Sequence, residues 1–506
     1  MAKSIMFQGT GSSVGKSLLV TALCRILKED GFKVAPFKSQ NMALNSFVTK
    51  SGGEIGRAQA TQAESAGIEP TVDMNPILLK PTSDKGSQVI IHGRVYDNMS
   101  ASEYHAFKKE AVGFVLESYK RLSGEYDVIV IEGAGSPAEI NLRDNDIANM
   151  GLAELIDSPV FLIGDIDRGG VFASLVGTME LLSNSEQDRV KGFIINKFRG
   201  DKNLLKTGLE FLEGRTNKPV LGVVPYIKDI LLPEEDGVVL EGKGQWPGVK
   251  GKQINITVVK LPRISNFTDL DAFKIEPDVD LKYVSSPAEL EGADAVIIPG
   301  TKNTIEDLQW LWDRGIAEAV INYAKRGGMV IGICGGYQML GLKISDPYKI
   351  ETDKGEAEGL GLLPVETVLE KDKVTVQAEA VSLMDGMRVS GYEIHMGRTG
   401  GAVNKINPAF KIVKRGKERV NTEDGAVSID GRVFGTYIHG LFDSDEFRQS
   451  FINRLRVKKG FSPSYSKSRH SEAKEEAFDR LATIVRESLD IERIYELAGI
   501  YNRVSP

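Results

Sequence analysis

The chain has 506 residues, of which 41% are hydrophobic and 26% are charged, and its formal net charge is −7. This length exceeds what one hydrophobic core usually supports, so we expect two or more globular domains. The mildly acidic balance argues against a protein that binds nucleic acid or anionic membranes, while leaving room for a local basic pocket.

The cysteine content and the N-terminal segment predict a soluble cytoplasmic protein. The two cysteines, Cys24 and Cys334, do not form the paired framework of a secreted domain. The first residues enter an apolar strand without a signal-peptide pattern. No apolar run approaches the ~18 residues that a membrane helix requires.

A glycine-rich loop follows the first predicted strand at residues 5–7. It spans residues 9–17 with the sequence GTGSSVGKS, and the apolar residues after it recur at helical spacing. In such a strand–loop–helix unit, backbone N–H groups and the helix N-terminus attract phosphate, a lysine adds charge and a serine can bind Mg²⁺. Five residues, rather than the usual four, separate Gly9 from Gly15. The residues expected to bind ATP here are Thr10, Gly11, Gly15, Lys16 and Ser17, with Ser17 also binding Mg²⁺.

Four further apolar runs, at 128–131, 160–163, 192–195 and 220–224, predict a parallel sheet that is buried on both faces. Ligands of such sheets bind at the carboxyl ends of the strands. Glu132 follows the first of these runs and is placed to hold Mg²⁺ directly or through water, unless it is a solvated strand-end acid. Asn196 follows the third run, where it either hydrogen-bonds a purine or caps a loop.

A dense group of polar residues occupies 138–149, next to the strand that ends at Glu132. Asp144 and Asp146 belong to this group. The pattern indicates either a substrate- or metal-binding surface or an ordinary exposed loop.

Residues 241–253 are polar and rich in turn-forming residues, and we interpret them as a linker. We therefore expect a first α/β domain over residues 1–240 and a second over residues 254–506. The second begins with apolar runs at 254–259, 295–298 and 329–333. It ends in a tail whose apolar residues near 481–489 recur at helical spacing.

Cys334 follows the run at 329–333 within the sequence Gly-Ile-Cys-Gly-Gly, directly before a predicted helix. Flanking glycines permit the strained strand-to-helix turn that exposes a nucleophile. The N-terminus of a helix favours the thiolate form of a cysteine. The N–H groups of Gly335 and of a residue near Gly300 are placed to form an oxyanion hole. We predict that Cys334 is a catalytic nucleophile rather than an inert buried cysteine.

The base for this nucleophile should be one of five histidines, and His439 is the strongest candidate. It follows the strand predicted at 433–438 and precedes a turn at Gly440. His395 is the main competitor, and His470 lies in a predicted loop. An isolated histidine is more often structural than catalytic, so position alone does not decide between them.

Segments 332–341 and 437–440 resemble the class I glutamine amidotransferase domain of the cobyric and cobyrinic acid amidating family. The first half, with its Gly-Thr loop and the sequence EGAG at 132–135, is similar to the dethiobiotin-synthetase-like P-loop group. Narrower motifs at 37–45, 54–60, 75–81 and 141–152 resemble the branch that converts adenosylcobyrinic acid a,c-diamide to adenosylcobyric acid. The resemblance covers essentially the whole chain. It implies an α/β protein in which a P-loop parallel-sheet domain precedes an amidotransferase domain.

The reaction that the resemblance implies belongs to cobalamin biosynthesis. ATP would activate the b, d, e and g carboxylates of the corrin ring as acyl phosphates, and L-glutamine would supply ammonia. Making ammonia within the same chain would keep it unprotonated and out of water. The implied roles are nucleophile for Cys334, base for His439, oxyanion hole for Gly335, ATP and Mg²⁺ binding for Lys16 and Ser17, metal ligation for Glu132 and contact with the phosphorylated carboxylate for Asp146.

The sequence does not identify the group that orients His439. Triad amidotransferases usually carry a glutamate two residues after the histidine, where this chain has Leu441. The resembled subfamily also lacks that glutamate, so a Cys–His dyad is one solution. Glu393 and Asp443 are the candidate orienting groups.

Three alternative functions compete with amidation of the a,c-diamide. Cobyrinic acid a,c-diamide synthase shares both domains, although the 38–45 segment argues against it. A cell-wall amidating enzyme would lack its expected Mur-ligase-like half. A deviant P-loop positional ATPase, which belongs to a different class, would leave the second half unexplained.

Overall fold

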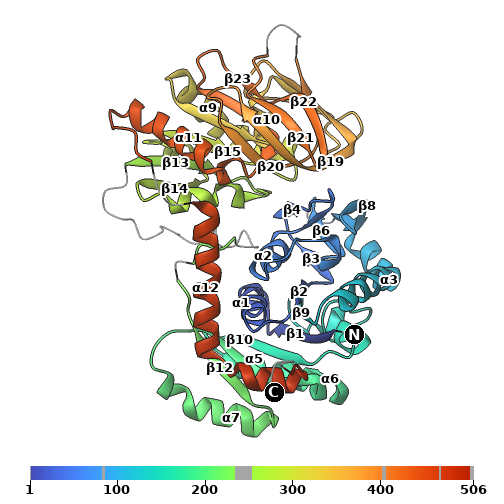
Figure 1. Cartoon of the computed structure of the whole chain (residues 1–506). Helices are drawn as coiled ribbons and strands as arrows, with labels where there is room; N and C mark the ends of the chain where they lie inside the picture. Colours follow the sequence, from blue (N-terminus) through green and yellow to red (C-terminus); the bar gives the residue numbers. More distant parts are fainter. Residues whose placement is uncertain are drawn as a thin grey trace.

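The computed structural model describes residues 2–82, 86–228, 230–233, 253–401, 406–465 and 469–501. The predicted linker at 241–253 lies outside these residues apart from Gln253. Two α/β halves follow one another along the chain (Figure 1). No helix in the described ranges has the length and hydropathy needed to span a bilayer.

The first half is built on a six-stranded parallel sheet with strand order β12-β11-β10-β1-β9-β2. Most residues of its strands are apolar and buried, as expected for a sheet that helices cover on both faces. One face packs on α1, and the other packs mainly on α3, α4 and α5. The elements are β1 (Lys3–Gly9), α1 (Lys16–Glu29), β2 (Val34–Phe37), α3 (Ala101–Glu125), β9 (Val128–Glu132), η2 (Ile140–Leu142), α4 (Met150–Leu155), β10 (Val160–Asp165), α5 (Val171–Leu181), α6 (Asn184–Arg189), β11 (Val190–Phe198), η3 (Lys202–Leu205), α7 (Lys206–Thr216) and β12 (Val220–Pro225).

An insertion between β2 and α3 faces the second half (Figure 1). It contains a four-stranded sheet with order β3-β6-β7-β8, the short antiparallel pair β4–β5 and helix α2. The elements are β3 (Gln40–Met42), β4 (Ser46–Val48), β5 (Glu54–Gly56), α2 (Arg57–Ser65), η1 (Val72–Met74), β6 (Ile77–Pro81), β7 (Gly86–Ile91) and β8 (Arg94–Ser100).

The second half contains two sheets. The first has the order β14-β13-β15-β16-β24-β23 and is parallel except at β23. The second has the order β18-β17-β19-β20-β25, with β21 also paired to β19 and β22 paired to β21. The elements are β13 (Ile254–Val259), η5 (Phe267–Ile275), β14 (Val279–Val284), η6 (Pro287–Leu290), β15 (Ala295–Ile298), α8 (Thr304–Asp313), α9 (Ile316–Lys325), β16 (Met329–Ile333), α10 (Gly335–Leu340), β17 (Lys343–Ser345), β18 (Glu356–Glu358), β19 (Glu366–Ser382), β20 (Arg388–Gly400), β21 (Phe410–Arg415), β22 (Glu418–Asp424), β23 (Ala426–Val427), β24 (Val433–Thr436), β25 (Ile438–His439), η7 (Leu441–Asp443) and α11 (Asp445–Lys458).

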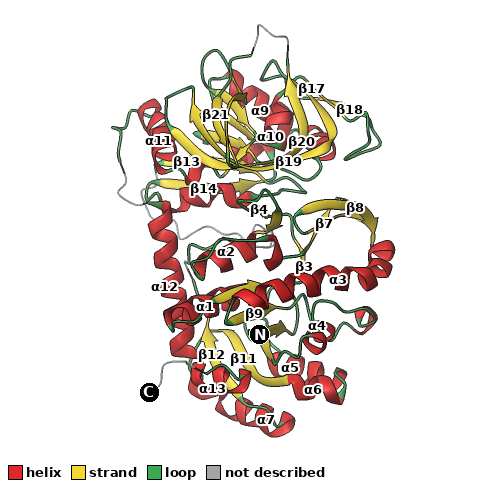
Figure 2. Ribbon diagram, turned by 45° about the vertical axis from the view of Figure 1, so that its right-hand side comes forward, coloured by secondary structure: helices red, strands yellow, loops and turns green. Residues whose placement is uncertain are grey.

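The C-terminal tail forms α12 (His470–Ser488) and α13 (Ile491–Ala498), and it returns to the first half. Helix α12 lies alongside α1 in both views (Figures 1 and 2). Its apolar residues, such as Leu481 and Val485, are buried in the same core as Leu19 and Leu23 of α1. The prediction of a helical tail is correct. The tail follows the second domain in the sequence, but it packs on the first domain. Helical periodicity shows that a face is apolar without showing which core buries it.

Candidate active site

Cys334 lies at a sharp turn between β16 and α10, in the strand–turn–helix arrangement that the sequence predicted. Its backbone has φ 52° and ψ −109°, which is strained for a residue other than glycine. Gly336 is needed at this turn, because an added Cβ would lie 1.9 Å from the carbonyl oxygen of Ile298. The Cys334 side chain is 8% exposed, and its Sγ lies 3.5 Å from the carbonyl oxygen of Ile394. A buried, strained cysteine at the carboxyl end of a strand is typical of a nucleophile elbow.

His439 is held by a carboxylate that the sequence reasoning missed. Its Nδ1 lies 2.6 Å from Oδ2 of Asp269, and Oδ1 of Asp269 accepts a 3.0 Å hydrogen bond from the N–H of Gly440. Burial alone lowers the pKa of His439, but the charge and hydrogen bond of Asp269, with help from the nearby Cys334, raise it to about 10. The imidazole therefore keeps its proton at neutral pH. Its Nε2 has no hydrogen-bond partner among the described residues, so the structure shows the histidine–carboxylate pair that a catalytic triad places beside its nucleophile.

Neither of the orienting groups proposed from the sequence contacts His439 by hydrogen bond. Glu393 instead accepts bonds of 2.6 and 2.8 Å from Arg415, and Asp443 lies 3.4 Å from Nδ1 of His470. The sequence did not predict Asp269 as the orienting group, because it precedes His439 by 170 residues. It also lies in the short helix η5, whose sequence has no recognisable catalytic motif. The available signal was its place in the loop after β13, at the carboxyl end of a parallel strand.

The competing histidine, His395, is held by other partners. Its Nδ1 lies 2.8 Å from the carbonyl oxygen of Gly397, and its ring stacks on Tyr437 with 3.8 Å between centroids. His439 is the histidine that the fold brings to the Cys334 elbow.

The loops that carry Gly300 and Gly335 meet beside the elbow. Strands β15 and β16 pair in parallel, so both loops leave the same edge of the sheet. A Cβ on Gly335 would lie 3.2 Å from the backbone nitrogen of Thr301, and one on Gly300 would lie 3.2 Å from Cε1 of His439. This proximity is compatible with the predicted oxyanion hole, which stays a prediction.

The phosphate loop of the first half surrounds the amine of Lys16. Lys16 Nζ donates hydrogen bonds of 2.9 Å to the carbonyl oxygens of Gly11 and Gly135. Gly15 has φ 96°, which favours glycine at this position. The N–H of Thr10 donates to the carbonyl oxygen of Ile163 at 3.0 Å, so this predicted phosphate donor is already hydrogen-bonded to the neighbouring strand.

Glu132 is buried beside this loop and has several partners. It accepts bonds of 2.9 Å from the Ser17 hydroxyl, 2.9 Å from Lys38 Nζ and 2.6 Å from Gln62 Nε2. Burial raises the pKa of Glu132, but Lys38, Gln62 and Lys16 outweigh burial and lower it. An ionised carboxylate next to a serine hydroxyl suits Mg²⁺, which proteins often bind through one or two side-chain oxygens plus substrate phosphates. The described residues contain no larger acidic or histidine cluster for a metal.

Two other predicted site residues support loops in this structure. Asn196 Nδ2 donates to the carbonyl oxygen of Val14 at 2.8 Å and so braces the phosphate loop. Asp146 accepts bonds of 2.9 to 3.0 Å from the N–H groups of Ala148, Asn149 and Gly151 and caps the start of α4. A purine contact of Asn196 and a substrate contact of Asp146 stay predictions.

Both halves match known families, in the order that the fold indicates. Residues 5–239 match the CobQ/CobB/MinD/ParA nucleotide binding domain, and residues 255–447 match the CobB/CobQ-like glutamine amidotransferase domain. The predicted α/β class, with a P-loop domain before an amidotransferase domain, is confirmed.

Full-length relatives agree with these domain matches. A cobyric acid synthase from Clostridium botulinum (strain 657 / Type Ba4) is 54% identical over 502 residues, which cover 99% of this chain and 100% of the relative. A cobyric acid synthase from Caldanaerobacter subterraneus subsp. tengcongensis is also 54% identical, over 510 residues and 99% of both chains. The chain therefore belongs to the cobyric acid synthases, a family of glutamine-dependent amidating enzymes.

Proposed function

We propose that this protein amidates the b, d, e and g carboxylates of adenosylcobyrinic acid a,c-diamide to give adenosylcobyric acid, using ATP and L-glutamine. The observation that carries the proposal is the presence in one chain of a Cys334–His439–Asp269 arrangement and a phosphate loop paired with Glu132. The first suits release of ammonia from an amide, and the second suits transfer of a phosphoryl group. Membership of the cobyric acid synthases supports the choice of a corrinoid acceptor.

In the glutaminase half, Cys334 attacks the side-chain carbonyl of glutamine as the thiolate. The carbon–nitrogen bond breaks, and His439 donates its proton to the departing ammonia. His439 is suited to this role because its pKa, raised to about 10, keeps the imidazole protonated at neutral pH. Water then cleaves the thioester, which releases glutamate and regenerates the thiol. Gly335 and Gly300 would stabilise the oxyanion formed in both steps.

In the ATP half, Lys16 and the loop N–H groups would bind the phosphates, and Ser17 and Glu132 would hold Mg²⁺. Bound Mg²⁺ would neutralise charge on the β- and γ-phosphates. A corrin carboxylate oxygen attacks the γ-phosphorus, and the bond to ADP breaks to leave an acyl phosphate. Ammonia then attacks the acyl carbon, and inorganic phosphate departs as the amide forms.

The test is an amidation assay with ATP, Mg²⁺ and L-glutamine, followed by mass spectrometry of the corrinoid. We expect four successive mass steps on the a,c-diamide. Cys334→Ala should abolish these steps with glutamine and restore them with ammonium. Cys24→Ala is the matched control, because Cys24 is buried in the first core and away from the elbow.

Other outcomes assign a different activity. Two amidations of cobyrinic acid, with the a,c-diamide unchanged, would establish cobyrinic acid a,c-diamide synthase instead. ATP hydrolysis that never depends on glutamine or on any corrinoid would favour a positional ATPase.

A further inference from the structure

One segment of the first half contacts both sites, and the proposed reaction gives it no role. This segment runs from residue 45 to residue 62 and is called the connecting segment here. It contains β4, β5 and the first part of α2, and it lies between the two halves (Figure 2). It also includes the whole 54–60 motif that distinguishes the chain at the sequence level.

The connecting segment is bonded to the start of the helix that carries Asp269. The N–H of Ser46 donates to Oδ1 of Asn266 at 3.0 Å, and the N–H of Phe267 donates to Oδ1 of Asn45 at 3.2 Å. Asn45, Ser46 and Asn266 are each at most 2% exposed. Asn266 caps η5 in the left-handed conformation with φ 51°. The two asparagines thus hold the turn that leads into Asp269 from opposite sides of the domain boundary.

A row of side chains also leads from the connecting segment to His439. The guanidinium of Arg57 lies 5.4 Å from the ring centroid of Phe47, and the Phe47 and Tyr392 rings are 6.1 Å apart. Tyr392 stacks on His439 with 5.2 Å between centroids and an interplanar angle of 11°. The hydroxyl of Tyr392 donates to the carbonyl oxygen of Ser46 at 3.3 Å. The plane of the His439 ring is therefore packed against contacts that begin in the other domain.

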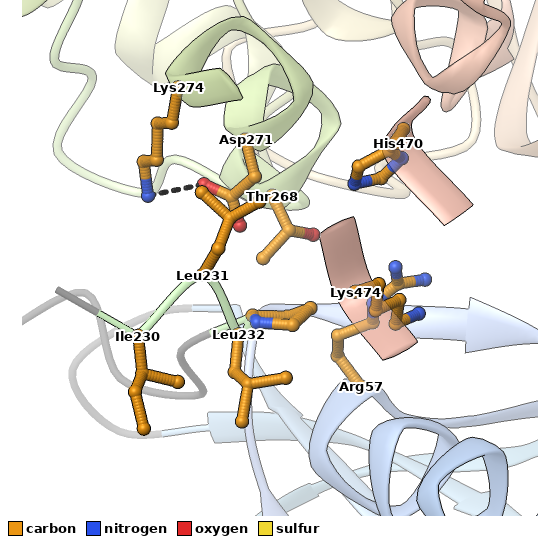
Figure 3. Close-up of a pocket in the computed structure, with 10 residues that line it drawn as sticks. Arg57, Ile230, Leu231, Leu232, Thr268, Asp271, Lys274, His470 and Lys474 are labelled. Atoms are coloured by element: carbon orange, nitrogen blue, oxygen red, sulfur yellow. Dashed lines mark ion pairs between the residues drawn. The ribbon is translucent and has the colours of Figure 1, made fainter. Parts of the chain in front are cut away.

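Arg57 and η5 line the same small cavity between the halves. The cavity is lined by Arg57 of α2, by Thr268 and Asp271 of η5, and by Lys474 of α12 (Figure 3). Thr268 and Asp271 flank Asp269 in the sequence. Burial lowers the pKa of Arg57, but nearby groups that include Glu64, Tyr392, Asp443 and Asp269 raise it overall, so the guanidinium stays charged.

The other end of the connecting segment reaches the ATP site. Gln62 of α2 donates to Oε2 of Glu132 at 2.6 Å. Arg57 and Gln62 are five positions apart on the same helix, so about 7.5 Å of helix axis separates them. If the hydrogen-bonded helix between them keeps its shape, a displacement at Glu132 would reach Arg57 and, through it, Phe47.

We propose that Asn45, Phe47 and Arg57 are positioning residues for the His439–Asp269 pair and that helix α2 couples them to the ATP site through Gln62. The inference rests on the proposed glutaminase role of Cys334. Glutamine hydrolysis would then depend on contacts supplied by the ATP domain. Occupation of the ATP site would change the rate of that hydrolysis.

The first test measures glutamine hydrolysis by the full chain without any corrinoid acceptor. We expect Asn45→Ala and Phe47→Leu to lower kcat by about 10- to 100-fold, because small misplacements of catalytic groups cost rates of this order. The KM for glutamine should change little, and Arg57→Lys should keep more activity than Arg57→Ala. Lys50→Ala is the control, because Lys50 lies in the exposed turn of the same segment and pairs with Glu69. Wild-type kcat in both Asn45→Ala and Phe47→Leu would overturn the positioning role.

The second test adds saturating MgATP to the same assay. We expect MgATP to change kcat for glutamine in the wild type and in Lys50→Ala, and to have no effect in Gln62→Met. Direct measurement of ATP binding shows whether Gln62→Met still fills the site. A response to MgATP that survives in an ATP-bound Gln62→Met, or that is absent from the wild type, would overturn the coupling.

A folding control keeps these results distinct from failure of the proposed function. Amidation driven by ammonium reports on the ATP half alone, and circular dichroism reports on folding. Variants that lose glutaminase activity while keeping ammonium-driven amidation support the inference. If wild-type protein fails to amidate the a,c-diamide even with ammonium, the proposed acceptor is wrong, while the glutaminase comparison still decides the positioning role.

Discussion

Replacement of Asp269 by asparagine tests the triad most directly. The asparagine keeps the shape of the side chain and can still accept the hydrogen bond from the N–H of Gly440, but it removes the charge beside His439. The pKa of His439 is raised from 6.5 to about 10, and the charge and hydrogen bond of Asp269 are the leading causes that raise it. That difference corresponds to about 5 kcal/mol of imidazolium stabilisation.

The expected loss in kcat/KM for glutamine is about 10³-fold, or about 4 kcal/mol. This allows part of the stabilisation to come from Cys334 and from relaxation of the site. A loss of this order also matches the general effect of removing the carboxylate that holds a catalytic histidine.

The pH dependence of glutamine hydrolysis gives the second measurement. In the wild type the imidazolium persists up to about pH 10, so activity that needs it should fall as the pH rises through that value. Without the carboxylate, burial lowers the pKa of His439 against less compensation, so the alkaline loss of activity should move to lower pH. The free energy of unfolding should change with pH in the same direction. Protonated His439 stabilises the folded state fully below about pH 6.5, and this contribution disappears as the pH rises through about 10.

The control is Asp443→Asn, which removes a nearby carboxyl group that lies 3.4 Å from Nδ1 of His470. We expect less than about a tenfold change in kcat/KM, because the bond between His439 and Asp269 stays intact. An Asp269→Asn variant with the wild-type rate and pH profile would refute the triad. Equal losses in Asp269→Asn and Asp443→Asn would show that general electrostatics, rather than the bond to Asp269, determines activity.

Three further changes probe other parts of the molecule. Glu132→Gln should lower ammonium-driven amidation by about 10²-fold, because it removes a charged group proposed to hold Mg²⁺. Amidation kinetics over a range of Mg²⁺ concentrations measure this effect. An unchanged rate and an unchanged Mg²⁺ dependence would contradict the prediction. Gly336→Ala should destabilise the protein by about 3 kcal/mol, because its Cβ would lie 1.9 Å from the carbonyl oxygen of Ile298. Denaturant unfolding measures this change, with the exposed Gly113→Ala in α3, where a Cβ meets no atom within 4 Å, as control. Leu481→Ala should cost about 2 to 5 kcal/mol of stability in the first half, since Leu481 is fully buried in that core; unchanged thermal unfolding would mean that the tail does not pack there.

Local patterns predicted the parts of the sites that are local in the chain. The phosphate loop and the Cys334 elbow each need glycines at set distances from a charged or nucleophilic side chain, between one strand and the next helix. The same logic placed Glu132 and His439 at the ends of strands. These predictions needed no knowledge of how the two halves meet.

The tertiary structure decided everything that depends on contacts between distant segments. Asp269 is the partner of His439 because two loops from different strands converge at one sheet edge. Glu393 is instead hydrogen-bonded to Arg415, and Asp443 lies beside His470. The tail packed on α1 because that core offered an apolar face for α12.

The sequence by itself thus determined the chemistry that each half carries, through residue types whose spacing along the backbone is short. Only the tertiary structure determined which carboxylate orients the histidine and which segment of the ATP domain reaches it. The physical reason is that the spacing between residues along the chain fixes their relative positions only within a single loop or turn. Packing, in contrast, selects among many side chains of equal chemistry that lie far apart in the sequence.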